Sequence, residues 1–307
     1  MATKSWRLVD ALKWGSGYLE EQGIEMSLLE SQLLLGHVLN RGQSYLYLNF
    51  EEFLSAESLS SFRNLIERRK ERIPWQYLTG QAEFMSGDFL VNEKVLIPRP
   101  ETEILVEAAL KKIKSWHAIQ SQFLTPNSYF PIIDIGTGCG NIAITLSKTL
   151  PCQVYALDIS ESALQVAREN AQRLGSGQEI TFLQGDMFAL GRPGPGAIFR
   201  GLEGKVDLLI SNPPYVSTSE LDSLQPEVSC FEPRAALDGG EDGLKFYPPL
   251  IEGAVTFLRP GGYLALEMGI NQAKVVEQLI IEKNRFHYPE IIKDYSGIER
   301  VIIARKR

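Results

Sequence analysis

The chain has 307 residues, of which 44% are hydrophobic and 22% are charged, and its formal net charge at pH 7 is −7. These values are typical of a globular protein with one large or two unequal domains, and they exclude a disordered or fibrous chain. An acidic chain gains no general attraction to nucleic acid from counterion release, which disfavours that class of partner. No run approaches the ~18–20 apolar residues of a membrane-spanning helix, and the N-terminus lacks the apolar segment of a secretory signal.

Cysteine and histidine usage indicates a reducing compartment and argues against a metal site. Cys139, Cys152 and Cys230 form neither a paired framework nor a CxxC motif, so we predict a cytoplasmic protein. The three histidines are far apart in the sequence and form no cluster with cysteine, so we predict no bound metal. We further expect a monomer without membrane association.

Residues 1–80 are predicted to form a small, all-helical domain. Ser27-Leu-Leu-Glu30 has the pattern of a capping box, in which the two side chains satisfy backbone N–H groups at a helix start. A further helix is predicted over Ala56–Arg72, and Pro74 helps to end it. The basic run Arg68–Arg72 could bind an acidic partner, but we favour a solvated helix end whose cations complement the helix dipole.

Residues 81–100 are predicted to be a hairpin that links this domain to a second one. Short apolar runs suggest two strands before Pro98-Arg99-Pro100. The stretch Pro98–Glu103 is interpreted either as a rigid linker that caps the next helix or as a segment that closes over a ligand. The helix that follows is predicted over Glu101–Lys114.

The second domain, residues 101–307, alternates strands with helices. This alternation is typical of an α/β fold with a doubly wound, Rossmann-like sheet, which we predict to be mostly parallel with a late antiparallel strand. The predicted strands are 131–135, 153–158, 180–184, 206–211, 263–267, 290–293 and 298–304. The predicted helices are 141–150, 160–174, 246–258 and 272–282. The stretch Arg192–Gly204 is rich in Gly and Pro and is predicted to be a surface loop.

A glycine-rich turn between the first strand and its helix is the strongest ligand-binding signal. The turn reads Asp134-Ile-Gly-Thr-Gly-Cys-Gly140. Glycines allow close approach of a ligand to the backbone, and the free N–H groups of a helix start favour electronegative atoms. The spacing is Gly-x-Gly-x-Gly, and Asn141 stands where a dinucleotide fingerprint needs its third glycine.

Acidic residues end the next two predicted strands. Asp158 stands where a carboxylate would accept hydrogen bonds from ribose hydroxyls, each worth roughly 1.5–3 kcal/mol. It could instead cap the helix that starts near Ser160, but the glycine turn before it favours the ligand role. Asp186 and Met187 follow the third strand, where an adenine edge could be recognised.

Together these residues resemble the motifs of class I S-adenosylmethionine-dependent methyltransferases. The resemblance implies S-adenosylmethionine as cofactor and S-adenosylhomocysteine as product. It also implies that Asp158 binds ribose, that Asp186 and Met187 contact adenine, and that the glycine turn surrounds the methionine part. The residues of that turn are Gly136, Thr137, Gly138, Cys139 and Gly140.

The sequence Asn212-Pro213-Pro214-Tyr215 follows a predicted strand and is the candidate catalytic site. It could be only a strand-ending turn, but its chemistry suits methylation of an amide-like nitrogen. Such a nitrogen is a poor nucleophile because its lone pair is delocalised into the carbonyl. The Asn212 side-chain oxygen and the Pro213 carbonyl could grip its two N–H bonds and aim the lone pair at the methyl group, with Asn212 also against the cofactor.

Tyr215 completes this interpretation of the motif. Its ring could stack on a planar amide and face a sulfonium cation, a contact worth roughly 0.5–2 kcal/mol. The fixed φ of the prolines would stiffen the loop that carries the two acceptors. A nitrogen that has just gained a methyl group is strongly acidic, so we predict no catalytic histidine.

Further segments resemble the peptide chain release factor glutamine N5-methyltransferases, the HemK/PrmC family. They include 72–80, 89–91, 96–103, 232–243, 259–262, 267–269 and 294–300, so the resemblance covers nearly the whole chain. It implies that the substrate is the glutamine of the Gly-Gly-Gln loop in class I peptide chain release factors. It also implies that the helical domain docks the release factor and that 232–243 forms part of the substrate wall.

Three alternatives stay open. The nearest is an enzyme that methylates a glutamine of a ribosomal protein, although the Pro-Glu-Thr-Glu sequence that ends at Glu103 favours the release-factor enzyme. A DNA or RNA base methyltransferase would need a basic groove or a target-recognition domain, which the net charge of −7 disfavours. A non-enzymatic cofactor-binding module would require a degenerate target site, whereas Asn212 is intact.

Overall fold

The computed structural model describes residues 5–120, 130–177, 179–189 and 199–307. The chain divides into two compact units, which are described separately. The first contains Met1–Gln81 together with Gln225–Phe231, and the second contains Ala82–Leu224 and Glu232–Arg307. Among the described residues, no helix is both long enough and apolar enough to cross a membrane.

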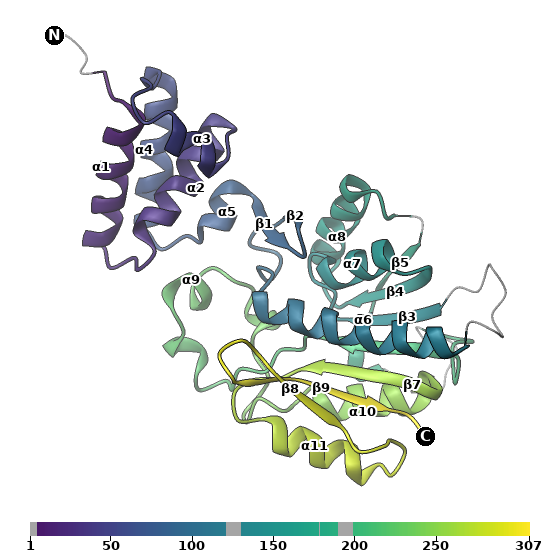
Figure 1. Cartoon of the computed structure of the whole chain (residues 1–307). Helices are drawn as coiled ribbons and strands as arrows, with labels where there is room; N and C mark the ends of the chain where they lie inside the picture. The colour runs from purple at the N-terminus through teal and green to yellow at the C-terminus, as the bar shows by residue number, and fades with distance from the viewer. Residues whose placement is uncertain (1–4, 121–129, 178, 190–198) are drawn as a thin grey trace. The chain divides into compact units, whose positions relative to one another are not determined.

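The first unit is helical, as the sequence predicts. Its helices are α1 (Leu8–Glu21), α2 (Ser27–Leu39), α3 (Gln43–Leu48), α4 (Ala56–Lys70) and α5 (Trp75–Thr79), and α9 (Pro226–Ser229) belongs to the same unit (Figure 1). Leucines of α1 and α2 pack with Phe62 and Ile66 of α4 in one apolar core. Burial of this core holds short helices together that would be marginal in isolation.

Two details of this unit differ from the prediction. The capping box at Ser27 is absent, because Met26 is the N-cap of α2 and makes no side-chain cap. The Glu30 carboxylate instead accepts hydrogen bonds from Arg69, which is only 4% exposed. The interpretation of Arg68–Arg72 as a solvated helix end is therefore wrong for Arg69.

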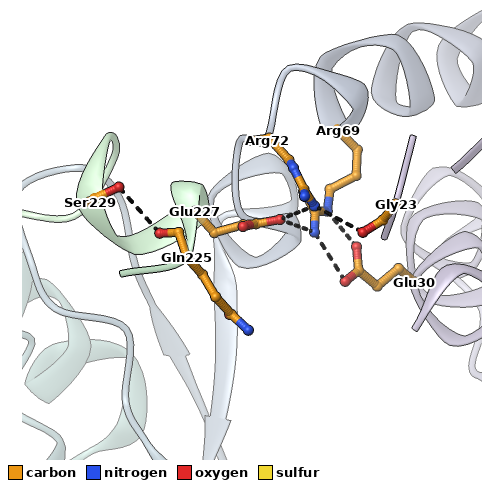
Figure 2. A network of polar contacts seen from close by, with 7 residues as sticks. All are labelled: Gly23, Glu30, Arg69, Arg72, Gln225, Glu227 and Ser229. Atoms are coloured by element: carbon orange, nitrogen blue, oxygen red, sulfur yellow. Dashed lines mark hydrogen bonds and ion pairs between the residues drawn. The ribbon is translucent and has the colours of Figure 1, made fainter. Parts of the chain in front are cut away.

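Arg69 lies in an ion-pair network that also includes a distant segment of the chain. Its Nη2 donates to Glu227 Oε1 at 2.8 Å, and Arg72 Nη1 donates to the same oxygen at 3.0 Å. Figure 2 shows the Glu227 side chain extending from α9 toward both arginines. A buried arginine costs free energy unless it is paired, so Glu30 and Glu227 explain why Arg69 can lie inside.

A hairpin and a long helix precede the sheet in the second unit. Strands β1 (Gln81–Phe84) and β2 (Gly87–Leu90) form the predicted hairpin, and α6 (Pro100–Gln120) extends beyond the predicted helix end. Asn170 of helix α8 (Glu161–Leu174) hydrogen-bonds to both backbone groups of Leu90, so the hairpin is attached to the body of this unit. Its role as a linker between domains stays a prediction.

The second unit contains a seven-stranded sheet in the order β5-β4-β3-β6-β7-β9-β8. All adjacent pairs from β5 to β7 are parallel, and β9 is antiparallel to both of its neighbours. The predicted fold class is thus confirmed. The strands are β3 (Phe130–Ile135), β4 (Cys152–Asp158), β5 (Ile180–Gln184), β6 (Val206–Ser211), β7 (Leu258–Glu267), β8 (Glu290–Lys293) and β9 (Glu299–Arg305).

Helices cover both faces of the sheet. On one side α6 contacts α7 (Asn141–Thr149), which contacts α8 (Glu161–Leu174), while α10 (Tyr247–Phe257) contacts α11 (Ala273–Glu282) (Figure 1). The strand order runs from β3 to β5 in one direction and from β6 to β7 in the other. Because crossovers between parallel strands are right-handed, these two directions place the connecting helices on opposite faces of the sheet. The chain reverses this direction between β3 and β6, and ligands of such sheets bind at that switch point.

β7 begins at Leu258, five residues before the predicted start, because Leu258 pairs with Val206 ahead of an irregularity in register. Of the predicted surface loop Arg192–Gly204, residues 192–198 lie outside the described part of the chain.

Candidate active site

The predicted cofactor and target residues follow three neighbouring strands at one edge of the sheet. β3 pairs in parallel with both β4 and β6, with Ile135 opposite Leu157 and Ser211. The Gly136 N–H donates to the Leu157 carbonyl at 2.8 Å, and Ser211 Oγ donates to the Ile135 carbonyl at 2.7 Å. These bonds fix the glycine turn and the Asn-Pro-Pro-Tyr loop at the same carboxyl edge.

The glycine turn needs its glycines for two different reasons. Gly136, Gly138 and Gly140 have φ values of +72°, +55° and +83°, which other residues rarely adopt. A side chain at Gly138 would meet nothing within 4 Å, so the turn has open space beside it. A side chain at Gly140 would meet Ala167 of α8 at 3.2 Å, so this glycine permits close helix packing instead.

Asn170 of α8 hydrogen-bonds to the backbone of the glycine turn. This buried residue of α8 donates from Nδ2 to the Cys139 carbonyl at 2.9 Å and to the Leu90 carbonyl at 3.0 Å. Its Oδ1 accepts from the Leu90 N–H at 2.7 Å. One amide therefore joins the glycine turn, the hairpin end and the helix. Cys139 itself is buried, which raises the pKa of its thiol to about 12, so it is an inert packing residue here.

Asp158 contacts the glycine turn directly. Its Oδ2 accepts from the Gly138 N–H at 2.9 Å, and its Oδ1 accepts from the Ser160 N–H at 2.9 Å. Ser160 itself caps α8 by accepting from the Ala163 N–H. The N-cap residue of α8 is therefore Ser160 and not Asp158. Each carboxylate oxygen has further acceptor capacity. Burial raises the pKa of Asp158, while hydrogen bonds from the backbone N–H groups of Ser160, Gly138 and Ile159 lower it.

Asp134 lies beneath the turn and is fully buried. Thr137 Oγ1 donates to its Oδ2 at 2.6 Å, whereas Oδ1 has no hydrogen-bond partner in the described part of the chain. Burial, with a smaller contribution from Asp158, raises the pKa of Asp134 to about 7. One oxygen of this buried carboxyl therefore has no hydrogen-bond donor beneath the turn.

Asp186 and Met187 lie at the end of β5, next to the same edge. The Gly185 N–H donates to the Asp158 carbonyl at 2.9 Å, which joins the two strand ends. Asp186 is exposed, and its Oδ1 accepts from the Phe188 N–H at 2.9 Å at the start of a short turn. Met187 is half-buried against the apolar core. Their contact with adenine stays a prediction.

The Asn212 side chain has one defined hydrogen bond. Its Nδ2 donates to Thr102 Oγ1 of α6 at 3.0 Å, and Thr102 Oγ1 donates to Glu267 Oε2 at the end of β7, at 2.7 Å. Among the described residues, Asn212 Oδ1 and the Pro213 carbonyl accept no hydrogen bond. Neither proposed acceptor is therefore occupied by another group of the described chain.

Tyr215 is held by the same carboxylate. Its hydroxyl donates to Glu267 Oε1 at 3.3 Å. Burial, reinforced by the nearby carboxylate, raises the pKa of Tyr215 far above its usual range, so its hydroxyl stays neutral. Glu267 is also fully buried, which raises its pKa to about 7. Asn212 and Tyr215, the ends of the motif, thus share one buried anchor.

The backbone of the Tyr215 loop is enclosed at close range. Gln272 Nε2 donates to the Tyr215 carbonyl at 2.9 Å. A side chain at Gly239 would meet Tyr215 Cα at 2.8 Å, and one at Gly243 would meet its carbonyl oxygen at 2.4 Å. A side chain at Gly269 would lie 3.1 Å from the Tyr215 ring. Segment 232–243 therefore has glycine at 239 and 243 for a structural reason, because a side chain at either position would collide with the Tyr215 backbone.

The same segment is anchored at its other end. Glu232 accepts from the Arg99 guanidinium and from the Ile97 N–H, the latter at 3.2 Å. Burial raises the pKa of Glu232, and Arg99 opposes that shift. Val216 exchanges backbone hydrogen bonds with Leu237 and Gly239. Segment 232–243 thus connects the Pro98–Glu103 stretch to the chain that leaves the target loop.

Residue patterns alone assigned no role to Thr102, Glu267, Gln272 or Asn170. Thr102 and Glu267 do lie within segments that carry the family resemblance. A polar residue expected within an apolar strand or helix face is the signal that could have identified them. Their pairing could not be read, because it depends on α6 lying against β6 and β7.

The residues fit the predicted cofactor. The turn has three glycines at positive φ with open space beside Gly138, Asp158 has unused acceptor capacity, and the Asp134 carboxyl lies beneath the turn. The Asn212 carbonyl oxygen lies 3.9 Å from where a Cβ of Gly136 would stand, so the target loop borders the glycine turn. The predicted assignments of these residues to cofactor and substrate remain predictions.

Comparison with known proteins identifies relatives over the whole chain. Residues 10–80 match the PrmC N-terminal domain, and residues 126–295 match a methyltransferase domain. A release factor glutamine methyltransferase of Geobacter sulfurreducens is 40% identical over 98% of this chain and 97% of that protein. One from Moorella thermoacetica is 42% identical over 93% of each chain.

Among solved structures, the hMettl16 catalytic domain in complex with the MAT2A 3′UTR hairpin 6 is similar in fold. The TM-score is 0.50 and the sequence identity 13%, with coverage of 70% of this chain and 74% of that one. At this identity the likeness concerns the fold alone.

Proposed function

Because the chain belongs to the family of release factor glutamine methyltransferases, we propose that it methylates the side-chain amide nitrogen of a glutamine in a peptide chain release factor. The methyl donor is S-adenosylmethionine, and the target is the glutamine of the Gly-Gly-Gln loop in class I factors. The reaction takes place in the cytoplasm, where release factors act. The monomeric state stays a prediction.

One observation supports this function above the others. Asn212 Nδ2 is bound to Thr102, so Asn212 Oδ1 is presented at the carboxyl edge with the Pro213 carbonyl. A primary amide of glutamine has two N–H donors in one plane, and these two oxygens match them. Holding both hydrogens aims the nitrogen lone pair in one direction, and such orientation can contribute ~7–11 kcal/mol in ideal cases.

The chain's own residues divide the remaining tasks. Gly136–Gly140 and Asp158 would hold the cofactor, which supplies an electrophilic methyl group on a sulfonium when bound. Tyr215, whose hydroxyl is fixed by Glu267, can present its ring to the planar amide and to the cation. No basic side chain is needed to remove a proton before the bond forms, because the methylated nitrogen is the acidic species.

The helical unit is proposed to dock the release factor. Several of its apolar side chains are exposed, including Leu28 at 52%, Tyr47 at 53% and Leu48 at 84%. Gln32 of α2 donates to the Tyr47 hydroxyl at 2.7 Å, so α2 and α3 are in contact next to Tyr47. A cluster of exposed apolar residues is typical of a protein-binding surface.

Methyl transfer to purified proteins tests this function. The protein is incubated with radiolabelled S-adenosylmethionine and one of four acceptors: a class I release factor, the same factor with its Gly-Gly-Gln glutamine changed to alanine, a ribosomal protein fraction, or DNA. We expect label only in the unmodified factor. Label in the ribosomal fraction or in DNA, with none in the factor, would replace the proposed substrate.

The Asn212→Ala variant tests the role of the acceptor in the same assay. We expect turnover to fall by about 100-fold or more, because a misaligned nitrogen loses the benefit of orientation. Binding of the cofactor, measured by calorimetry, should stay close to that of the unaltered protein. A variant with normal turnover would remove Asn212 from the mechanism and leave the substrate assignment standing.

A further inference from the structure

We infer that Thr102 and Glu267 act as positioning residues that fix the direction in which the Asn212 side-chain amide faces. Neither residue needs to touch the substrate for this role. The inference rests on the proposed function, because it concerns how the substrate amide is held. It adds two residues that lie outside the motif and a dependence of the reaction on the charge of one buried carboxyl.

The direction of the hydrogen bonds carries the argument. An ionised carboxylate can only accept, so Glu267 takes the hydroxyl hydrogens of both Thr102 and Tyr215. Thr102 has then used its single hydrogen, and its oxygen can only accept. The Asn212 side chain must therefore turn its NH₂ group toward Thr102, at 3.0 Å, and its oxygen away. The acceptor that the substrate needs is specified by a chain of two bonds.

Protonation of Glu267 would remove this specification. A neutral carboxyl can donate to Thr102 Oγ1, which frees the Thr102 hydrogen to point at Asn212. The Asn212 amide can then rotate by half a turn and present its NH₂ group to the glutamine. The Asn212 NH₂ and the glutamine NH₂ are both donors and cannot hydrogen-bond to each other. The substrate nitrogen then loses one of the two acceptors that orient it.

The surroundings of Glu267 make such a change accessible near neutral pH. Both Thr102 and Glu267 are almost completely buried, at 2% and 0% exposure. Burial raises the pKa of Glu267 to about 7, and the charge of Glu101 on α6 adds to this effect. Hydrogen bonds from Thr102 and Tyr215 and the charge of Arg300 on β9 oppose it.

Tyr247 also lies next to the end of β7, and its hydroxyl is neutral. The Tyr247 hydroxyl of α10 donates to Gln272 Oε1 at 2.8 Å and lies 3.4 Å from the Glu267 backbone carbonyl, and burial raises its pKa well above the usual range. The carboxyl of Glu267 is therefore the group whose charge changes near neutral pH at this point.

Two threonine variants test the inference. Thr102→Val keeps the shape but removes the acceptor for Asn212, whereas Thr102→Ser keeps the hydroxyl. We expect kcat for release factor methylation to fall about 10-fold in Thr102→Val, the equivalent of one hydrogen bond of ordinary strength. KM for the factor and cofactor affinity should change little, whereas the melting temperature should fall because the buried Glu267 Oε2 loses its donor. Thr102→Ser should recover most of the rate and of the stability.

The pH profile of kcat supplies an independent readout. In the unaltered protein kcat should rise with pH through about 7, as Glu267 ionises, and then level off. Glu267→Gln cannot ionise, so its lower kcat should lack this rise. An unchanged kcat in Thr102→Val, or a rise that persists in Glu267→Gln, would overturn the inference. If the unaltered protein labels no release factor, the proposed function fails first, so the two failures are distinguishable.

Discussion

Asn212 Nδ2 lies 3.0 Å from Thr102 Oγ1, although the two residues are 110 positions apart in the chain. Asn212 leaves the end of β6, whereas Thr102 belongs to the first turn of α6. The bond connects the Asn-Pro-Pro-Tyr loop to the Pro98–Glu103 stretch, so both motifs belong to one arrangement. It gives Thr102, a polar residue at the start of that helix, a direct contact with the motif.

Removing the Asp158 carboxylate should weaken cofactor binding. In Asp158→Ala we expect the dissociation constant of S-adenosylmethionine to rise about 10-fold to 100-fold, since one or two charge-assisted hydrogen bonds are lost. Isothermal titration measures this directly. Glu161→Ala is a matched control, because Glu161 lies three residues further on and its carboxylate is bound to the solvent-exposed Arg168. Equal affinities of the two variants would count against the ribose assignment.

Asn170→Ala should destabilise the second unit and loosen the glycine turn. The change leaves the half-buried backbone groups of Leu90 and the buried Cys139 carbonyl without these hydrogen bonds. Orphaned buried groups cost roughly 1–3 kcal/mol each, so we expect the free energy of unfolding to fall by about 2 kcal/mol or more. Urea denaturation measures the loss, and the exposed neighbour Gln172→Ala is the control. A loss of similar size in both variants would show that the bridge contributes nothing specific.

The stability of the protein should fall as the pH rises from about 4 to about 7. Burial raises the pKa of Asp134 from 3.8 to about 7 and that of Glu267 from 4.5 to about 7. The folded state then binds more protons than the unfolded state within this window. The stabilisation is complete below the unfolded pKa values and is lost as pH rises through the folded ones.

Urea denaturation across this pH window measures the effect. Each group contributes a slope of up to about 1.4 kcal/mol per pH unit. Asp134→Asn and Glu267→Gln should each flatten the curve, and the double variant should flatten it most. A stability that rises with pH across the same window in the unaltered protein would contradict the direction of both shifts.

The strands and the glycine turn could be predicted from the sequence, because short buried runs of apolar residues determine them locally. Ile180–Gln184, Val206–Ser211 and Glu290–Lys293 have the predicted bounds. The prediction of a capping box at Ser27–Glu30 was wrong because a contact with a residue far along the chain decides how Glu30 is used. Arg69, 39 positions away, takes the Glu30 carboxylate, and no local pattern contains that competition.

The candidate site divides in the same way. The loops that carry Gly136–Gly140 and Asn212–Tyr215 are recognisable because each needs a special backbone within a few residues. Thr102, Glu267 and Gln272 are ordinary residues in ordinary elements, and only the strand order places them against the motif. The roles of Gly239 and Gly243 likewise depend on how closely Tyr215 approaches them.

The proposed docking surface can be tested without touching the site. Leu48 is 84% exposed at the end of α3. Leu48→Asp should raise KM for the release factor about 10-fold, as expected for an interface residue worth more than about 1 kcal/mol, and leave kcat unchanged. Tyr288→Asp is the control, an exposed aromatic residue of the second unit. The same KM in both variants would show that Leu48 does not belong to the docking surface.

The most direct test of the catalytic arrangement is a crystal structure with S-adenosylhomocysteine and the release factor bound. We predict that Asn212 Oδ1 and the Pro213 carbonyl each lie within hydrogen-bonding distance of the glutamine amide nitrogen, while Asn212 Nδ2 still contacts Thr102. A glutamine nitrogen bound elsewhere, or an Asn212 oxygen turned toward Thr102, would contradict the account.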